Sequence, residues 1–178
     1  EMINNYRDSN NLKNKFVIGF IGNLRDSYTG LDFLLSFFKL AYSENNNMCM
    51  LLVGPTSNEQ RKVIVNTPGV IYKGHLPPDQ MPLIFNVINV GILPFDKTPF
   101  TDHALPIKII EYGAAKKYVI SSNLIGVQEI NLPYIHIVNR EENLWLKTLK
   151  HIMNLSWKTS YDEAIDKFEW ERISKDIL

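Results

Sequence analysis

The residues with the clearest chemical potential are Pro106, Lys108 and Glu111, which stand together at the start of a predicted helix. Pro106 suits the first turn of a helix, where its missing N–H carries no penalty, so we expect the helix to open near Leu105. Lys108 and Glu111 are three positions apart and share one helix face. A helix N-terminus attracts anions, whereas a lysine in its first turn is unfavourable unless an anion is bound. This helix start therefore indicates a site for an anionic ligand.

Glu111, Arg25 and His75 suit the recognition of a nucleotide. The Glu111 carboxylate can accept hydrogen bonds from both hydroxyls of a ribose, and the Arg25 guanidinium can pair with a phosphate. The backbone of His75, at a predicted strand end, can meet the edge of a base. Each residue alone also fits a simpler role, because a lone charged residue on a helix or loop is usually a solvated surface residue. A nucleotide-binding role for any of these residues is therefore supported only by their combination.

Several common site motifs are absent from the sequence. No G-x-G-x-x-G pattern follows the first predicted strand and no G-x-x-x-x-G-K-[ST] pattern occurs, which removes the main support for a dinucleotide or P-loop site. No G-x-S-x-G nucleophile elbow occurs either. The histidines lack metal-ligand spacing, so we expect no metal site. They are His75, His103, His136 and His151.

Short apolar runs alternate with helical patterns along the chain. Strands are expected at 16–21, 48–53, 70–72, 90–93, 118–120 and 135–138. Helices are expected at 31–42, 58–66 and 77–85, from Leu105, in a short stretch ending at Asn131, and at 141–155 and 161–178. This alternation predicts an α/β fold, a three-layer Rossmann-like doubly wound parallel sheet of about six strands, with the ligand outside the strands' carboxyl ends. The central helix is expected to bury the face that carries Ile109, Ile110, Gly113 and Ala114.

Length and composition fit one soluble globular domain. The chain has 178 residues, of which 45% are hydrophobic and 21% charged. Nineteen basic residues balance nineteen acidic ones, so no net field favours nucleic acid. Residues 1–15 are rich in asparagine and are expected to form a linker, an N-terminal tail or a frayed helix before a domain at 16–178. The sequence opens on Glu1 rather than methionine, as expected for a piece of a longer protein.

A set of short motifs occurs in one order and spacing along the chain. They are Gly22-Asn23-Leu24, Tyr28-Thr29-Gly30, Val53-Gly54-Pro55, Gly74-His75-Leu76, Leu93-Pro94, Pro106-x-Lys108-x-x-Glu111-Tyr112, Val119-Ile120-Ser121-Ser122 and Phe168-Glu169-Trp170-Glu171-Arg172-Ile173. Together they resemble the carboxyl-terminal half of GT-B glycosyltransferases, and more narrowly the "group 1" family that uses nucleotide-sugar donors. The resemblance covers about residues 16–178. The last motif resembles the family's final helix, which packs on the amino-terminal half.

The resemblance implies a role for each matching residue. Glu111 corresponds to the second glutamate of the family's paired-glutamate motif, which holds the donor ribose. Backbone N–H groups around Leu105 to Ile107 would face the diphosphate. Gly22 to Leu24, with Asn23, would border the diphosphate and the sugar, while Gly74 to Leu76 would flank the base and Gly54 would belong to the same strand-end site. We accordingly expect Leu105, Pro106 and Ile107 to form part of the donor site.

Three departures from the family pattern bear on the chemistry. The family's first glutamate lies eight positions before the second, and this chain has His103 there. We therefore take His103 as a candidate catalytic residue, and the identity of the transferred sugar stays open. The family's basic loop residue is replaced by Thr29, and its paired glycines are reduced to Ile125-Gly126. Arg25 or Lys108 is expected to supply the missing positive charge.

The resemblance predicts the donor-binding domain of a glycosyltransferase of polysaccharide biosynthesis. A sugar would pass from a UDP- or GDP-type nucleotide sugar to a glycan or lipid-linked acceptor, with retention of configuration and without a metal. The missing amino-terminal half would hold the acceptor, so this chain alone is expected to be inactive. One cysteine and no signal peptide favour the cytoplasm, where the full-length enzyme would associate peripherally with the inner face of the membrane.

Two alternatives remain from the sequence. A GT-B-type sugar-nucleotide epimerase would use the same scaffold for a different reaction, and it would consume the donor without an acceptor. A non-catalytic flavodoxin-like module would lack nucleotide affinity and would carry an acidic cluster at the strand ends. The sequence has no such cluster.

Overall fold

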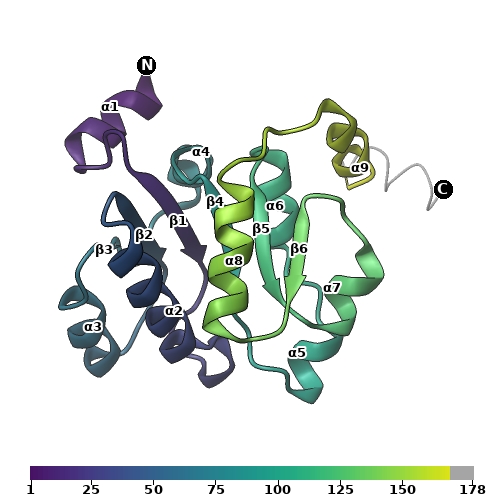
Figure 1. Ribbon diagram of the computed structural model, residues 1–178, viewed down its shortest axis with the longest axis horizontal. Coiled ribbons are helices and arrows are strands. Elements are labelled where there is room, and N and C mark those ends of the chain that lie inside the picture. The colour runs from purple at the N-terminus through teal and green to yellow at the C-terminus, as the bar shows by residue number, and fades with distance from the viewer. Residues whose placement is uncertain (169–178) are drawn as a thin grey trace.

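The computed structural model describes residues 1–168 and contains a six-stranded sheet with helices on both faces (Figure 1). The strands are β1 (Phe16–Ile21), β2 (Met48–Val53), β3 (Val70–Tyr72), β4 (Val90–Leu93), β5 (Tyr118–Ser122) and β6 (Ile135–Val138). All neighbouring strands pair in parallel, in the order β3-β2-β1-β4-β5-β6. The predicted doubly wound α/β fold is confirmed, and β5 runs on to Ser122.

The strand order places a topological switch between β1 and β4. From β1 the chain adds β2 and β3 on one side, then returns to add β4, β5 and β6 on the other. This is the dinucleotide-binding Rossmann order rather than the flavodoxin-like order, in which the third strand lies directly beside the first. The flavodoxin-like alternative is therefore wrong. A ligand crevice is expected outside the carboxyl ends of the strands at this switch.

Helices form the two outer layers. On one face, α2 (Leu31–Glu44) and α8 (Glu142–Ile152) pack side by side. On the other face lie α4 (Met81–Val87) and α6 (Lys108–Ala114), with α1 packed on α4 and α9 packed on α6. The remaining helices are α1 (Met2–Ser9), α3 (Asn58–Val65), α5 (Pro99–His103), α7 (Ile125–Ile130) and α9 (Asp162–Asp166). Because both faces are covered, β2, β4 and β5 are buried throughout, which explains their continuous apolar runs.

Tyr112, in the middle of α6, fastens that helix to the sheet. Its ring lies over Gly91 of β4, where an added Cβ would come within 2.6 Å of the ring carbons. Its hydroxyl donates a hydrogen bond to the carbonyl oxygen of Gly19 in β1, at 2.9 Å. Burial raises the pKa of Tyr112 far above its usual value. The glycine in β4 thus lets α6 sit close enough for Tyr112 to reach across to β1.

The buried face of α6 differs from the predicted face at Ile110, which is only half-buried, and at Ala114. Ile109, Tyr112 and Gly113 are buried, whereas Ala114 is exposed. The Tyr134 hydroxyl explains the need for glycine at 113, since an added Cβ would lie 2.3 Å from that oxygen. Tyr134 donates this hydroxyl to the Ile109 carbonyl at 3.1 Å. Two tyrosines therefore fix the rotation of α6 about its own axis.

Residues 1–15 form a packed part of the domain rather than the linker or tail that their composition predicted. Arg7 on α1 donates hydrogen bonds to the carbonyl oxygens of Val87 and Lys15. Leu12 is fully buried in the hydrophobic core. The asparagine-rich composition hid these two anchors, because a single arginine and a single leucine hold the segment.

The closing segments are shorter than predicted within the described residues. Helix α8 ends at Ile152, and after a loop the chain forms α9 and a half-buried Phe168 that packs against the core. Trp157 donates its indole N–H to Asp162 at 2.9 Å, which ties the loop to α9. The predicted positions Trp170 and Ile173 lie outside the described residues.

Replacing Tyr112 by phenylalanine should lower the free energy of unfolding by about 1–3 kcal/mol, because the buried Gly19 carbonyl loses its partner. Urea unfolding followed by circular dichroism measures the effect. The matched control is Tyr42→Phe, since Tyr42 is half-buried and its hydroxyl makes no hydrogen bond within residues 1–168. Equal stability losses for the two variants would contradict the anchoring role.

Candidate functional site

A crevice of about 350 Å³ opens where β1, β2 and β3 end and α6 begins. Its volume lies in the range of small-molecule sites. Five of the predicted residues line it, namely Gly22, Gly54, His75, Lys108 and Glu111. The rest of the lining consists of Ile21, Val53, Pro55, Leu76, Pro78 and Met81. The crevice therefore combines an apolar wall with a pair of charged side chains.

Three glycine-containing strand ends form the floor of the crevice. The Gly54 N–H donates to the Gly74 carbonyl at 2.7 Å, and the Gly22 N–H donates to the Val53 carbonyl at 2.9 Å. Gly54 has a φ of +135°, and an added Cβ would lie 1.8 Å from the Gly22 carbonyl oxygen. Only glycine permits this approach. The Tyr72 hydroxyl donates to the Gly54 carbonyl at 2.9 Å and completes the bonding of this turn.

Lys108 and Glu111 form an ion pair at the edge of the crevice. The Lys108 Nζ lies 2.6 Å from Glu111 Oε2. That carboxylate oxygen is buried, and the contact lacks hydrogen-bond geometry, so the oxygen has no hydrogen-bond partner within residues 1–168. The side chains are 28% and 37% exposed, so the pair contributes little to stability. The predicted shared face is confirmed, and Glu111 balances the lysine that the helix N-terminus alone would disfavour.

Helix α6 begins at Lys108 rather than near Leu105 as predicted. The Glu111 N–H bonds to the Ile107 carbonyl at 3.2 Å, so Leu105 to Ile107 precede the helix. Proline disfavours the helical conformation of the residue before it, which explains the later start. The N–H groups of Leu105, Ile107 and Lys108 have no hydrogen-bond acceptor within residues 1–168. The Leu105 and Ile107 side chains are exposed, and neither they nor Pro106 line the crevice.

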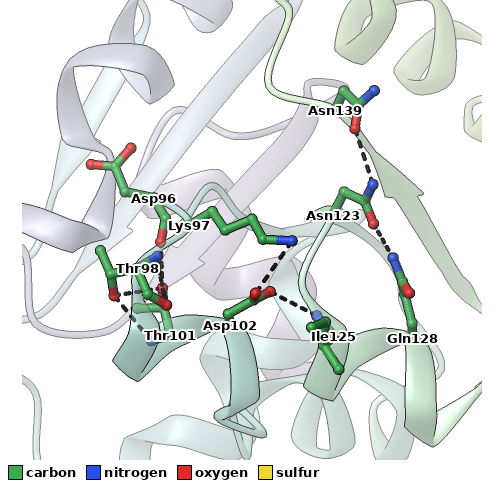
Figure 2. Close-up of polar contacts among 9 residues, drawn as sticks. All are labelled: Asp96, Lys97, Thr98, Thr101, Asp102, Asn123, Ile125, Gln128 and Asn139. Carbon is green, nitrogen blue, oxygen red and sulfur yellow. Dashed lines mark hydrogen bonds and ion pairs between the residues drawn. The ribbon is translucent and has the colours of Figure 1, made fainter.

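The loop between β4 and α6 contains a short helix, α5, that the sequence interpretation missed. The Thr98 hydroxyl accepts a hydrogen bond from the Thr101 N–H at 3.1 Å, and the Thr101 hydroxyl accepts one from the Thr98 N–H at 2.8 Å (Figure 2). Thr101 also donates its hydroxyl to the carbonyl oxygen of Asp96. Thr98 followed directly by Pro99, a capping residue before a proline at the first helical position, was the available signal for this helix start.

The end of α5 is joined to the start of α7. The Asp102 carboxylate accepts a hydrogen bond from the Ile125 N–H at 3.0 Å and lies 3.2 Å from the Lys97 Nζ (Figure 2). The Ile125 hydrogen bond is the main cause that lowers the pKa of Asp102. At Gly126 an added Cβ would lie 2.6 Å from the Ala104 carbonyl oxygen. The backbone before Leu105 is therefore held directly against α7.

Besides Leu105, Pro106 and Ile107, three more predicted residues lie outside the lining of the crevice, namely Asn23, Arg25 and His103. The Asn23 amide donates to the Asp26 carboxylate at 2.9 Å, and the Arg25 Nε donates to the Thr56 carbonyl at 3.2 Å. Both side chains are exposed and join loops at the rim. His103 is exposed on the last turn of α5. The structure thus brings Gly22, Gly54, His75, Lys108 and Glu111 together and leaves the other six predicted residues outside the lining.

Thr29 and Arg140 have structural roles that the sequence did not reveal. The buried Thr29 hydroxyl donates to the Asn23 carbonyl at 2.8 Å and closes the loop after β1. Arg140, just after β6, pairs with the Asp96 carboxylate and lies 4.8 Å over the Phe33 ring. Burial lowers the pKa of Arg140 from its ordinary value. Arg140 therefore places a guanidinium, paired with Asp96, beside the Thr29–Gly30 turn, where an added Cβ at Gly30 would lie 2.9 Å from its Nη2.

The comparisons with known proteins decide the family. The profile described as "Glycosyl transferases group 1" matches residues 15–147. The chain belongs to the group 1 glycosyltransferases. A Bacillus subtilis (strain 168) relative, TuaH, named as a candidate teichuronic acid biosynthesis glycosyltransferase, is 29% identical over 123 residues, which cover 67% of this chain and 30% of the relative.

Two solved glycosyltransferase structures share the fold. Sucrose-phosphate synthase from Thermosynechococcus elongatus has a TM-score of 0.78 at 19% identity, over 98% of this chain and 47% of that protein. Anabaena HepE in complex with UDP and glucose has a TM-score of 0.80 at 15% identity, over 99% of this chain and 50% of that protein. The chain thus spans about half of these relatives, and the predicted likeness to part of a GT-B fold is confirmed.

Residues 1–168 contain neither a helix suited to span a membrane nor a cluster of metal-ligand side chains. None of the helices there has the length and apolarity needed to cross a membrane. Within the same residues, no three side chains of histidine, cysteine, aspartate or glutamate gather as metal ligands.

Replacing Gly54 by alanine should cost about 3 kcal/mol or more, because the new Cβ collides with the Gly22 carbonyl. The matched control is Gly74→Ala, another strand-end glycine with a positive φ of 65°, whose added Cβ meets nothing nearer than 3.9 Å. That variant should cost about 1–2 kcal/mol, the penalty of the left-handed conformation alone. Urea denaturation compares the two, and a smaller loss for Gly54→Ala than for Gly74→Ala would contradict this account.

Proposed function

We propose that this chain is the donor-binding half of a glycosyltransferase that transfers a sugar from a UDP- or GDP-type nucleotide sugar to a glycan or lipid-linked acceptor. The observation that carries the proposal is the strand-end crevice, where three glycine turns meet the Lys108–Glu111 pair. Family membership supports sugar transfer as the reaction. The structure of HepE with UDP and glucose supports a nucleotide sugar as the ligand.

The nucleoside would occupy the crevice itself. The Glu111 carboxylate would accept hydrogen bonds from the two ribose hydroxyls, and its buried Oε2 has a free acceptor position for one of them. The base would lie against the apolar wall that includes Pro55 and Leu76, beside the backbone of His75. Flat apolar surface with a few backbone polar groups suits a nucleobase.

The diphosphate would lie at the start of α6. The N–H groups of Leu105, Ile107 and Lys108 have no acceptor within residues 1–168 and are available to phosphate oxygens. On binding, the Lys108 ammonium would turn from Glu111 toward the phosphates. Donors held in place before reaction stabilise the charge that develops on the leaving diphosphate. The chain's own groups therefore suffice for this role in the proposal, and no metal is invoked.

The rest of the enzyme would complete the reaction. The chain spans about half of its solved relatives, and the acceptor would bind to the other half. Exposed His103, at the position of the family's first glutamate, would face the transferred sugar. The family resemblance favours retention of configuration, and we propose a cytoplasmic enzyme at the inner membrane face. Holding two reactants in near-attack geometry supplies about 7–11 kcal/mol of barrier reduction, so this half alone would not transfer sugar.

The Glu111→Ala variant should bind UDP or GDP more weakly by about 1.5–3 kcal/mol, the range for hydrogen bonds to charged groups. Its melting temperature should hardly change, because a partly exposed ion pair contributes little to stability. Isothermal titration calorimetry and thermal denaturation measure the two effects, with Glu59→Ala on exposed α3 as the control. A large stability loss with unchanged affinity would make Glu111 structural. Failure of the unsubstituted chain to bind UDP, GDP or ADP at millimolar concentration would contradict the proposed function.

The Lys108→Ala variant should lose affinity for UDP but keep its affinity for uridine, because the ammonium acts on the phosphates. The loss should shrink with added salt, as expected for a partly exposed charge. Arg25→Ala should have a smaller effect, since its guanidinium is held at the rim by the Thr56 carbonyl. Calorimetry at two salt concentrations tests both variants. Equal losses for uridine and UDP would rule out the phosphate role of Lys108.

A further inference from the structure

The backbone between β4 and α6 ends in the free N–H groups of Leu105, Ile107 and Lys108. We propose that Asp102 is a positioning residue for these groups, because its carboxylate fastens α5 to the N-terminus of α7 (Figure 2). This inference rests on the proposed function, in which the same N–H groups bind the diphosphate. Asp102 itself would not touch the ligand.

Asp102 supplies a hydrogen-bond acceptor that α7 cannot supply for its own first N–H group. Ile125 is the first residue of α7, and its N–H has no acceptor within that helix. The residue before it, Leu124, has no polar side chain to cap the helix. Asp102, 23 positions earlier in the chain, supplies the missing acceptor at 3.0 Å. Its side chain is only 13% exposed, so water competes little for this bond.

A second contact holds the same stretch of backbone. At Gly126 an added Cβ would lie 2.6 Å from the Ala104 carbonyl oxygen and 3.1 Å from the His103 carbonyl carbon. The first turn of α7 therefore abuts the two residues that connect Asp102 to Leu105. Close packing at 126 sets the distance between the segments, and the Asp102 bond keeps them together.

The start of α7, to which Asp102 is bonded, is also held by side-chain hydrogen bonds to the end of β6. The Asn123 amide donates to the Asn139 side chain at 3.1 Å, and the Gln128 amide donates to Asn123 (Figure 2). These bonds join the start of α7 to the end of β6. Loss of the Asp102 carboxylate should therefore release the loop that carries the N–H groups rather than α7. Small displacements of such donors have large effects on binding and catalysis.

The test compares UDP and uridine binding by Asp102→Ala, Asp102→Asn and Asp162→Ala. Asp162 is a matched control, because its carboxylate also accepts an N–H bond, from Trp157 at 2.9 Å, and pairs with a lysine, Lys116. Asp102→Ala should lower UDP affinity about five- to tenfold, as expected for a lost helix cap, and uridine affinity less than about twofold. Asp102→Asn keeps an acceptor oxygen and should stay within about twofold of the unsubstituted chain.

Amide hydrogen exchange without ligand gives a second readout. The Ala104 N–H is bonded to the Thr101 carbonyl at 3.3 Å and the Ile109 N–H to the Pro106 carbonyl at 3.0 Å, and exchange at these two protected amides should be faster in Asp102→Ala and unchanged in Asp162→Ala. Unchanged exchange, or equal losses for UDP and uridine, would overturn the positioning role while UDP binding by the unsubstituted chain kept the proposed function intact. An unsubstituted chain that binds neither UDP nor GDP would instead refute the proposed function, and the diphosphate role of the loop with it.

Discussion

The contact of Tyr112 with the sheet determines where the donor site can form. Its ring rests on Gly91 and its hydroxyl reaches the Gly19 carbonyl, so α6 is fixed in height and rotation against β4 and β1. Lys108, one helical turn before Tyr112, and Glu111, the residue directly before it, then lie beside the glycine turns at the topological switch. A larger residue at 91 would push α6 outward and separate its charged pair from the strand ends.

The charged pair in the lining of the crevice is electrostatically balanced rather than positive. The Glu111 carboxylate is paired with the Lys108 ammonium, and both side chains line the same crevice. A bound diphosphate would draw Lys108 away and leave the carboxylate free for ribose hydroxyls. The diphosphate and the ribose of one nucleotide would then bind cooperatively. The diphosphate would take up the Lys108 ammonium, and the ribose hydroxyls would bind the Glu111 carboxylate that is left without its partner. A free phosphate or a nucleoside alone would gain only part of this binding free energy.

The sequence predicted what depends on local pattern. All six strands were located from short apolar runs, which are continuous in β1, β2, β4 and β5 because these strands are buried on both faces. The strand-end glycines and the Lys108–Glu111 spacing located the crevice. The missed helix α5 had a local signal in Thr98 and Pro99, whereas the other missed features depend on residues distant in the chain. The prediction put Ala114 on the buried face because the sequence of α6 does not reveal its contact with Tyr134, which is distant in the chain. The bond of Asp102 was missed because its partner, Ile125, lies on another helix.

The bond between Tyr112 and Gly19 joins residues 93 positions apart in the chain. During synthesis β1 emerges well before one of its two neighbours, β4, which begins only at Val90. A growing chain therefore carries β1 with one apolar edge unpaired until more than half of the domain has been made. Long-range parallel pairing is slow and leaves such edges open to wrong partners. The strand-end crevice consequently cannot form until α6, which follows β4 in the chain and carries Lys108 and Glu111, has been made.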